Sequence, residues 1–126
     1  MAADERLNRK QIGALGEEMA CQALERRGYT IIERNWRCPI GEIDIVAKDG
    51  DCWAFVEVKT RHGRGMGLPE EAVTSTKADR LSELAQTYLT TADAGLVDWR
   101  IDLVAIELDR HHSVQRLRVI PGIGVD

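Results

Sequence analysis

The 126-residue sequence has no long hydrophobic run and few cysteines, and both shortages exclude broad classes of protein. No stretch approaches the roughly 20 apolar residues that a membrane-spanning helix needs. Residues 1–10 are polar and charged, with no apolar segment behind them, which argues against a secretory signal. Cys21, Cys38 and Cys52 show no CxxC spacing, so we expect neither a disulfide framework nor a zinc knuckle. A reducing compartment, the cytoplasm by default, is therefore expected.

Basic residues are not in excess either, since the formal net charge is −4. That balance by itself does not indicate a nucleic-acid-binding protein. The positive charges are unevenly spread, and they gather at Arg26, Arg27, Arg34 and Arg37 and, around His62, at Lys59, Arg61, Arg64, Lys77 and Arg80. Phosphate backbones bind to such clusters of Lys and Arg. On charge alone, however, a solvated surface of mixed charge is the more frequent explanation.

The chain also lacks internal repeats, low-complexity tracts and linker-like segments. Its length suits one domain, and a domain of this size buries about two-thirds of its unfolded surface. Apolar residues make up 44% and charged residues 30%, both ordinary for a globular protein. We therefore predict a single domain that covers residues 1–126.

Periodicity predicts two helices and five strands. Apolar residues recur at helical spacing over 8–27, where Asn8 and Gln11 form a candidate capping box and Gly28 a stop. A second helix begins between Pro69 and Ser75 and runs to about residue 90. Strands are expected at 29–35, 41–48, 52–60, 99–108 and 114–120. This order of helix, three strands, helix and two strands predicts an α/β fold with a mixed sheet.

The hairpin within 41–60 places charged residues on one face. Asp49-Gly50 is a strong turn signal, and centring the turn there pairs Lys48 with Asp51. In that register Asp44 lies opposite Phe55, and Glu42 lies opposite Glu57. Side chains directly opposite each other share a face, so Asp44, Glu57 and Lys59 project from the same side of the hairpin.

Two carboxylates and a lysine on one face of a half-buried sheet are costly unless something uses them. A divalent cation resolves the repulsion, because Mg²⁺ binds one or two carboxylates together with water and phosphate oxygens. Such a cation can activate water for attack on a phosphate, and a nearby lysine can orient that water. The alternative is a solvated salt-bridge ladder formed by Asp44, Glu57 and Lys59, and the two explanations have even odds on this pattern alone.

Three neighbouring features bear on the choice. Trp53 and Phe55 share the face of Glu57, so this face is not simply exposed to water. Lys77 lies one turn before Leu81 and would point along the core face of its helix, unless its ammonium turns back to solvent. Glu17 could add a third carboxylate, although a surface charge is its more frequent role.

The motifs together resemble a known family. GEIDIV at 41–46 and FVEVKTR at 55–61 are similar to the YraN-like family (uncharacterised protein family 0102), as are segments 16–17, 35–37, 73–81 and 99–104. That family resembles the PD-(D/E)XK nuclease superfamily, nearest the archaeal Holliday-junction resolvases. Ile43 stands where the named pattern has proline, a change that the superfamily tolerates.

The resemblance implies a restriction-endonuclease-like core and a catalytic set of Asp44, Glu57, Lys59 and Glu17. Mg²⁺ or Mn²⁺ would bind Asp44, Glu57 and Glu17. It further implies an endonuclease that acts on DNA, with branched or flapped structures among its substrates, and a homodimer as a candidate assembly. Residues expected to contact nucleic acid are Arg61, Lys77, Arg80 and Arg37. The alternatives are a non-catalytic or weakly catalytic nucleic-acid-binding accessory protein and a protein-interaction module.

Weaker candidates are assigned structural roles. His111 and His112 are adjacent, so they face opposite ways on a strand, and we interpret them as a polar turn. Asp102 is interpreted as one half of a structural ion pair with Arg100. The glycine-rich segment 61–68 lacks a Walker lysine-serine and is expected to be a mobile loop beside the site.

Overall fold

The computed structural model describes residues 7–63, 65 and 67–124, so the extreme N-terminus and Arg64 of the predicted basic cluster lie outside it. The elements are α1 (Arg9–Arg26), β1 (Thr30–Cys38), β2 (Gly41–Asp49), β3 (Cys52–His62), a 3₁₀ turn (Pro69–Ala72), α2 (Ser75–Thr91), β4 (Trp99–Leu108) and β5 (Val114–Ile120). Their order confirms the prediction. No helix in the described part of the chain is long and apolar enough to cross a membrane.

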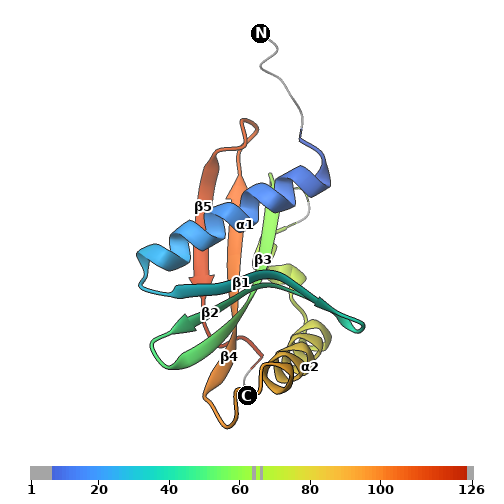
Figure 1. The fold of residues 1–126 in the computed structure, drawn as a ribbon. Coiled ribbons are helices and arrows are strands. Elements are labelled where there is room, and N and C mark those ends of the chain that lie inside the picture. Colours follow the sequence, from blue (N-terminus) through green and yellow to red (C-terminus); the bar gives the residue numbers. More distant parts are fainter. Residues whose placement is uncertain (1–6, 64, 66, 125–126) are drawn as a thin grey trace.

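The strands form one mixed sheet in the order β1-β2-β3-β4-β5 (Figure 1). Strands β3 and β4 are parallel, with Phe55 opposite Ile101, and the other neighbours are antiparallel. A parallel pair needs a long crossover connection, and here α2 supplies it. The predicted mixed five-stranded α/β fold with two main helices is therefore confirmed.

The core has two layers, one on each face of the sheet. Under α1, Leu24 packs with alternate sheet residues such as Val56 and Val104. Under α2, Phe55 packs with Leu84 and Tyr88, and the Phe55 and Tyr88 rings meet edge to face with centroids 5.6 Å apart. Burying each such side chain contributes about 1.5–3 kcal/mol. The two layers hold β2 and β3 from both sides at their centres.

Helix α1 begins and ends near the predicted residues. The capping box is present, since the Gln11 backbone N–H donates to Asn8 Oδ1 at 2.8 Å and the Asn8 N–H donates to Gln11 Oε1 at 2.9 Å. Gly16 brings the helix against β3, because a Cβ on Gly16 would lie 2.0 Å from Thr60 Oγ1. This close approach fixes the position of the next residue, Glu17, relative to the sheet.

The register predicted for the β2–β3 hairpin is wrong by two residues. The observed pairs run from Asp49–Cys52 to Ile45–Val56, so Gly50 and Asp51 are the central turn residues and Gly50 has φ +62°. Asp44 is therefore not opposite Phe55, and Glu42 is not opposite Glu57. A shift of two residues keeps each side chain on its face within the paired segment, but the pairing ends at Ile45 and does not include Asp44.

Two other boundaries also differ. Strand β1 covers Thr30–Cys38 rather than 29–35, because this edge strand is mostly exposed and lacks a clear apolar alternation. Helix α2 begins at Ser75, where the Thr74 side chain accepts a hydrogen bond from the Lys77 backbone N–H, and the preceding turn at Pro69–Ala72 is separate. The helix therefore starts at the late end of the predicted interval.

Candidate functional site

The site begins where β2 separates from β3. Their pairing stops at Ile45–Val56, and the next residue of β2, Asp44, accepts a hydrogen bond from the Val58 backbone N–H at its Oδ2 atom, 2.8 Å away. Beyond this point Ile43 packs in the layer under α2, whereas Ile45 packs under α1. The divergence of the strands therefore leaves room for the Asp44 carboxylate at the edge of β3.

Asp44 and Glu57 lie against each other in this space. Burial, and then the negative charge of Glu57, raise the pKa of Asp44 to about 7, although the Val58 N–H opposes the shift. Glu57 itself is only 7% exposed. Two carboxylates in contact away from water resist being ionised together, so the pair retains a proton near neutral pH or requires a cation.

Two lysines face this pair. The Lys77 Nζ atom lies 2.8 Å from Glu57 Oε2, which confirms the prediction that Lys77 points along the core face of α2. Burial lowers the pKa of Lys59, and the charge of Lys77 lowers it further. Burial also opposes the charge on Lys77, but its contact with Glu57 raises the pKa of Lys77 overall. The cluster thus holds one strongly paired ammonium and one that loses its proton more easily.

Glu17 reaches the same region from α1. A cleft of about 580 Å³ is lined by Glu17, Asp44, Lys59 and Arg61, together with Arg9, Ile12, Gly13, Val58, Thr60, His62, Gly63 and Gly65. Burial raises the pKa of Glu17, and a hydrogen bond from Asn35 partly offsets this effect. Side-chain chemistry alone favoured a surface charge as the role of Glu17. In the structure, Glu17 of α1 shares a cleft with Asp44 and Lys59.

Asn35 is a residue of the site that sequence reasoning did not single out. It has φ +54°, a left-handed backbone conformation, and it lies in β1 between Arg34 and Trp36, which pair with Ile45 and Ile43. Asn tolerates this conformation better than most residues. An asparagine inside a predicted strand was the available signal, because asparagine is depleted in strands and enriched at such irregularities.

The donor set suits a hard divalent cation. Among residues 7–63, 65 and 67–124, no three His, Cys, Asp or Glu side chains form a group that could hold a metal ion alone. Mg²⁺ does not need such a group, since two carboxylates plus water and phosphate oxygens satisfy it. The Asp44–Glu57 pair could supply two such ligands, and its electrostatic repulsion would be relieved by the added charge.

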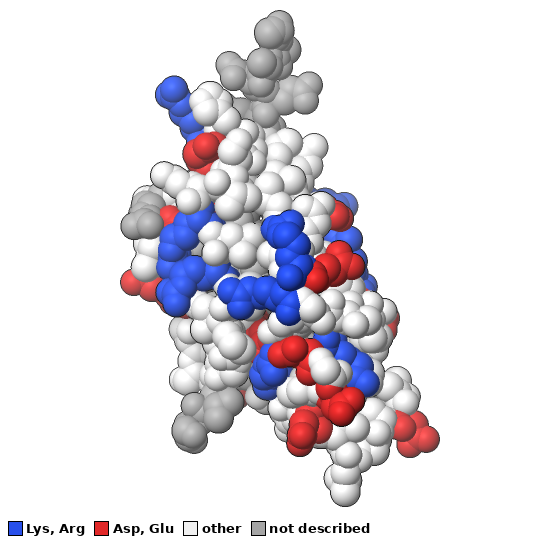
Figure 2. All heavy atoms as spheres, turned by 90° about the vertical axis from the view of Figure 1, so that its left-hand side faces the viewer, with Lys and Arg blue, Asp and Glu red and all other residues white. Residues whose placement is uncertain are grey.

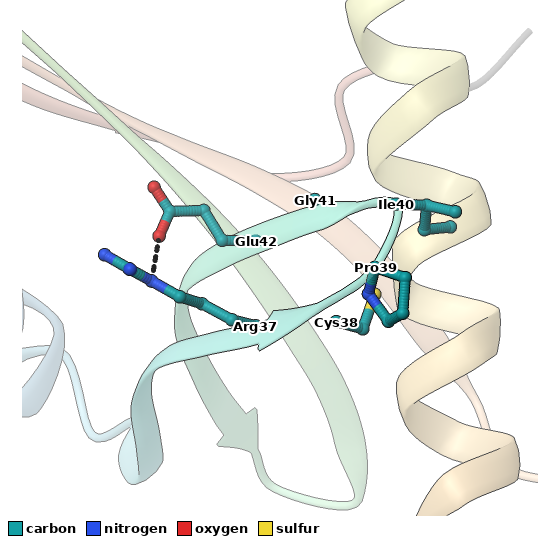
Figure 3. A pocket seen from close by; sticks show the side chains of 6 residues that line it. All are labelled: Arg37, Cys38, Pro39, Ile40, Gly41 and Glu42. Carbon is teal, nitrogen blue, oxygen red and sulfur yellow. Dashed lines mark hydrogen bonds and ion pairs between the residues drawn. The ribbon is translucent and has the colours of Figure 1, made fainter.

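The predicted phosphate-binding residues divide into two groups. Arg61 lines the cleft, and its Nε atom is buried without a hydrogen-bond partner in the described part of the chain. Arg37 instead pairs with Glu42 at 3.0 Å, and Arg80 donates to the Ile40 carbonyl oxygen. Arg37 and Glu42 line a second hollow of about 440 Å³ at the β1–β2 turn (Figure 3). Arg37 and Arg80 therefore lie outside the main cleft.

Asp102 and the two adjacent histidines have the structural roles that were predicted for them. Asp102 is fully buried and accepts hydrogen bonds from Arg100 Nε at 2.8 Å, the Tyr29 hydroxyl at 2.8 Å and the Gly122 N–H at 3.1 Å, which confirms the predicted ion pair. His111 and His112 lie in the β4–β5 turn as predicted, and the His112 ring stacks on His62 with centroids 4.9 Å apart.

Fold and site together define a small α/β protein with a buried carboxylate–lysine cluster beside the central strand of a mixed sheet. The chain belongs to Uncharacterised protein family UPF0102, whose family model matches residues 16–106.

Similar proteins have nearly the same length. A UPF0102 protein of Roseiflexus castenholzii is 49% identical over 115 residues, which cover 90% of this chain and 92% of the relative. One of Beutenbergia cavernae is 47% identical over 113 residues, covering 90% and 95%. One of Dictyoglomus thermophilum is 41% identical over 108 residues, covering 86% and 92%. The region that the family model matches, residues 16–106, contains Glu17, Asp44, Glu57, Lys59 and Lys77.

Proposed function

We propose that this protein is a Mg²⁺- or Mn²⁺-dependent phosphodiester hydrolase that cleaves DNA internally. The contact between the carboxylates of Asp44 and Glu57 carries the proposal; burial, and then the charge of Glu57, raise the pKa of Asp44 to about 7. A protein tolerates two acidic side chains pressed together where function uses them, and strongly perturbed carboxylates in a cleft are candidates for such use. Lys59 lies on the same cleft and supplies the third element.

Each residue of the cluster has a chemical role in this proposal. Asp44 and Glu57 hold the cation, which when bound activates water and stabilises charge on the phosphate. Lys59, whose pKa is lowered by burial, hydrogen-bonds the attacking water or the developing negative charge. Glu17 acts as a further ligand or orients that water from the α1 side of the cleft. Arg61 binds a phosphate oxygen with its guanidinium, whose Nε atom has no other described partner.

The motif similarity supports the same reaction. Asp44, Glu57-x-Lys59 and Glu17 match the acidic and lysine positions of the PD-(D/E)XK superfamily, and the structure places Asp44 and Lys59 on one cleft with Glu17. The resolvase-like branch suggests branched or flapped DNA as the substrate and a homodimer as the assembly. Arg37 and Arg80, near the β1–β2 turn, are then contacts for the DNA that flanks the cleaved bond.

The test is cleavage of single-stranded, duplex and branched DNA with Mg²⁺ or Mn²⁺. Asp44→Ala and Lys59→Ala are each expected to reduce the cleavage rate by about 100-fold or more, because each removes a group that acts on the transition state. Asp51→Ala and Lys48→Ala remove the same charges at the turn end of the hairpin and should retain the wild-type rate. Equal cleavage by all five proteins would reject the assignment.

A second function, nucleic-acid binding without catalysis, is favoured by a separate surface. Figure 2 shows Lys and Arg side chains gathered across the middle of the face that lies on the left in Figure 1, where the end of α1 and strand β5 are seen. Arg26 and Arg27, at the end of α1, are exposed, and so is Arg118 of β5. Salt-dependent DNA binding that is unchanged by EDTA and by Asp44→Ala would support this function over hydrolysis.

A further inference from the structure

The ion pair between Lys77 and Glu57 joins the second helix to the carboxylate cluster. Lys77 Nζ lies 2.8 Å from Glu57 Oε2, and the Lys77 side chain is 38% exposed whereas that of Glu57 is 9% exposed. The lysine therefore approaches the buried carboxylate from the solvent side. Its long, flexible stem allows the ammonium to leave Glu57 without movement of the helix backbone.

The helix itself offers little reason for a cation at this position. Lys77 is in the first turn of α2, directly after the Thr74 cap, and that turn contains no acidic residue. The first turn is the positive end of the helix dipole, where a cation is mildly unfavourable. The position of Lys77 is therefore explained by Glu57, not by its own helix.

The formal charges of the cluster already cancel without any added ion. Asp44 and Glu57 bring two carboxylates, and Lys59 and Lys77 bring two ammonium groups. A divalent cation at the same carboxylates would lie close to the Lys77 ammonium and be repelled by it. Glu57 Oε2 accepts from Lys77, so the ammonium and a cation would compete for the same carboxylate.

We propose that Lys77 is a counter-ion of Glu57 that a divalent cation displaces when it binds to the Asp44–Glu57 pair. This inference rests on the proposed function, because it assumes that Asp44 and Glu57 are the ligands of the cation. Displacement links two events, so that binding of the cation frees the Lys77 ammonium for an oxygen of the substrate phosphate. The lysine also tunes the affinity of the site, since it lowers the occupancy of the site at low cation concentration.

The inference is tested by isothermal titration calorimetry of the full chain with Mn²⁺. Lys77→Gln is expected to bind Mn²⁺ about fivefold more tightly than the wild type, which corresponds to about 1 kcal/mol. Lys77→Arg keeps the competing charge and should bind close to the wild type. Lys48→Gln, which removes the same charge at the other end of β2, should leave the affinity unchanged.

A second measurement needs no substitution. If Lys77 is displaced, saturating Mn²⁺ should increase the reactivity of its ammonium with an amine-specific reagent several-fold, as read by mass spectrometry, while Lys48 stays constant. Unchanged reactivity of Lys77 in the Mn²⁺-loaded protein would overturn the inference, and this readout applies even if Lys77→Gln does not fold.

The outcomes separate this inference from the proposed function. Mn²⁺ binding by the wild type, combined with equal or weaker binding by Lys77→Gln, would show that Lys77 positions Glu57 for the cation and does not compete with it. The inference would then be wrong and the cation site would stand. Absence of Mn²⁺ binding in every variant would reject both.

Discussion

Two buried acidic side chains lie almost next to each other on the central strands, and their surroundings differ completely. Asp102 in β4 is opposite Val56 and faces α1, whereas Glu57 in β3 faces α2. Asp102 has three hydrogen-bond donors, including the guanidinium of Arg100. Glu57 instead lies against a second carboxylate, that of Asp44, whose pKa is raised to about 7 by burial and by Glu57.

The difference separates a carboxylate that stabilises the fold from a pair that works against it. A buried carboxylate with a full set of donors holds its surroundings together. Two buried carboxylates in contact repel each other, which costs free energy of folding, and proteins concentrate such costs at functional sites. The electrostatics of the two clusters therefore identify the Asp44–Glu57 pair, and not the Asp102 network, as the candidate site.

The largest stability effect is expected at the satisfied cluster. Asp102→Ala should reduce the free energy of unfolding by about 3–5 kcal/mol, because Arg100 Nε, the Tyr29 hydroxyl and the Gly122 N–H each lose Asp102 as their acceptor. Asp49→Ala is the matched control, since Asp49 also pairs with Arg100, at 2.9 Å, but is exposed. The Asp49→Ala control should lower the free energy of unfolding, measured by urea denaturation, by less than about 1 kcal/mol. Similar losses for both variants would contradict the account.

The opposite effect, an increase in the free energy of unfolding, is expected when the Asp44 carboxylate is replaced by an amide. The folded protein keeps the Asp44 proton up to about pH 7, whereas the unfolded chain loses it near the ordinary value of 3.8. Stability from this group is therefore lost as the pH rises from about 4 to 7. Asp44→Asn cannot ionise, so in EDTA it should be more stable than the wild type by about 4 kcal/mol at pH 8 and by little at pH 4.

Urea denaturation at both pH values checks this prediction. Asp51→Asn, in the turn of the same hairpin, should show no such dependence because Asp51 is exposed. A constant difference between Asp44→Asn and the wild type at the two pH values would show that the Asp44 carboxylate is not strained by its surroundings.

A smaller effect is expected where α1 presents Glu17 to the cleft. Gly16→Ala should destabilise the fold by about 1–3 kcal/mol, because the new Cβ would meet Thr60 Oγ1. Thr60→Ala removes that atom and should recover part of the loss in the double variant. Gly13→Ala has open space around its Cβ and should instead stabilise the helix by up to about 1 kcal/mol. Thermal unfolding distinguishes the three variants, and equal effects of the two alanines would contradict the close approach.

Local sequence signals predicted the elements well and the hairpin register poorly. The ends of β4 and β5 and the Asn8–Gln11 box follow from short patterns, and the structure confirms them. The turn was misplaced because Asp49-Gly50 and Gly50-Asp51 both contain the glycine that supplies a positive φ. Turn preferences do not distinguish these two turns. Hydrophobic alternation does not distinguish them either, because a shift of the strand pairing by two residues leaves each paired side chain on the same face of the sheet.

The site itself could be predicted only in part, for a physical reason. Strand parity predicted a common face for Asp44, Glu57 and Lys59, but Ile43 and Ile45 pack on opposite faces of the sheet, so the alternation of β2 is broken at Asp44. The contact of Lys77 with Glu57 and the shared cleft of Glu17 and Asp44 depend on how helices pack on a twisted sheet, which no local pattern encodes. The same holds for Arg80, which reaches the Ile40 carbonyl oxygen from α2.

The central claim is that the strained pair, unlike the satisfied carboxylate, binds a divalent cation. The most direct test is the melting temperature at pH 8 with EDTA and with saturating Mn²⁺, because a ligand that binds only the folded state stabilises it. We predict that Mn²⁺ raises the melting temperature of the wild type and of Asp102→Asn by several degrees and leaves Asp44→Asn unchanged. An equal rise in Asp44→Asn, or no rise in the wild type, would contradict the claim.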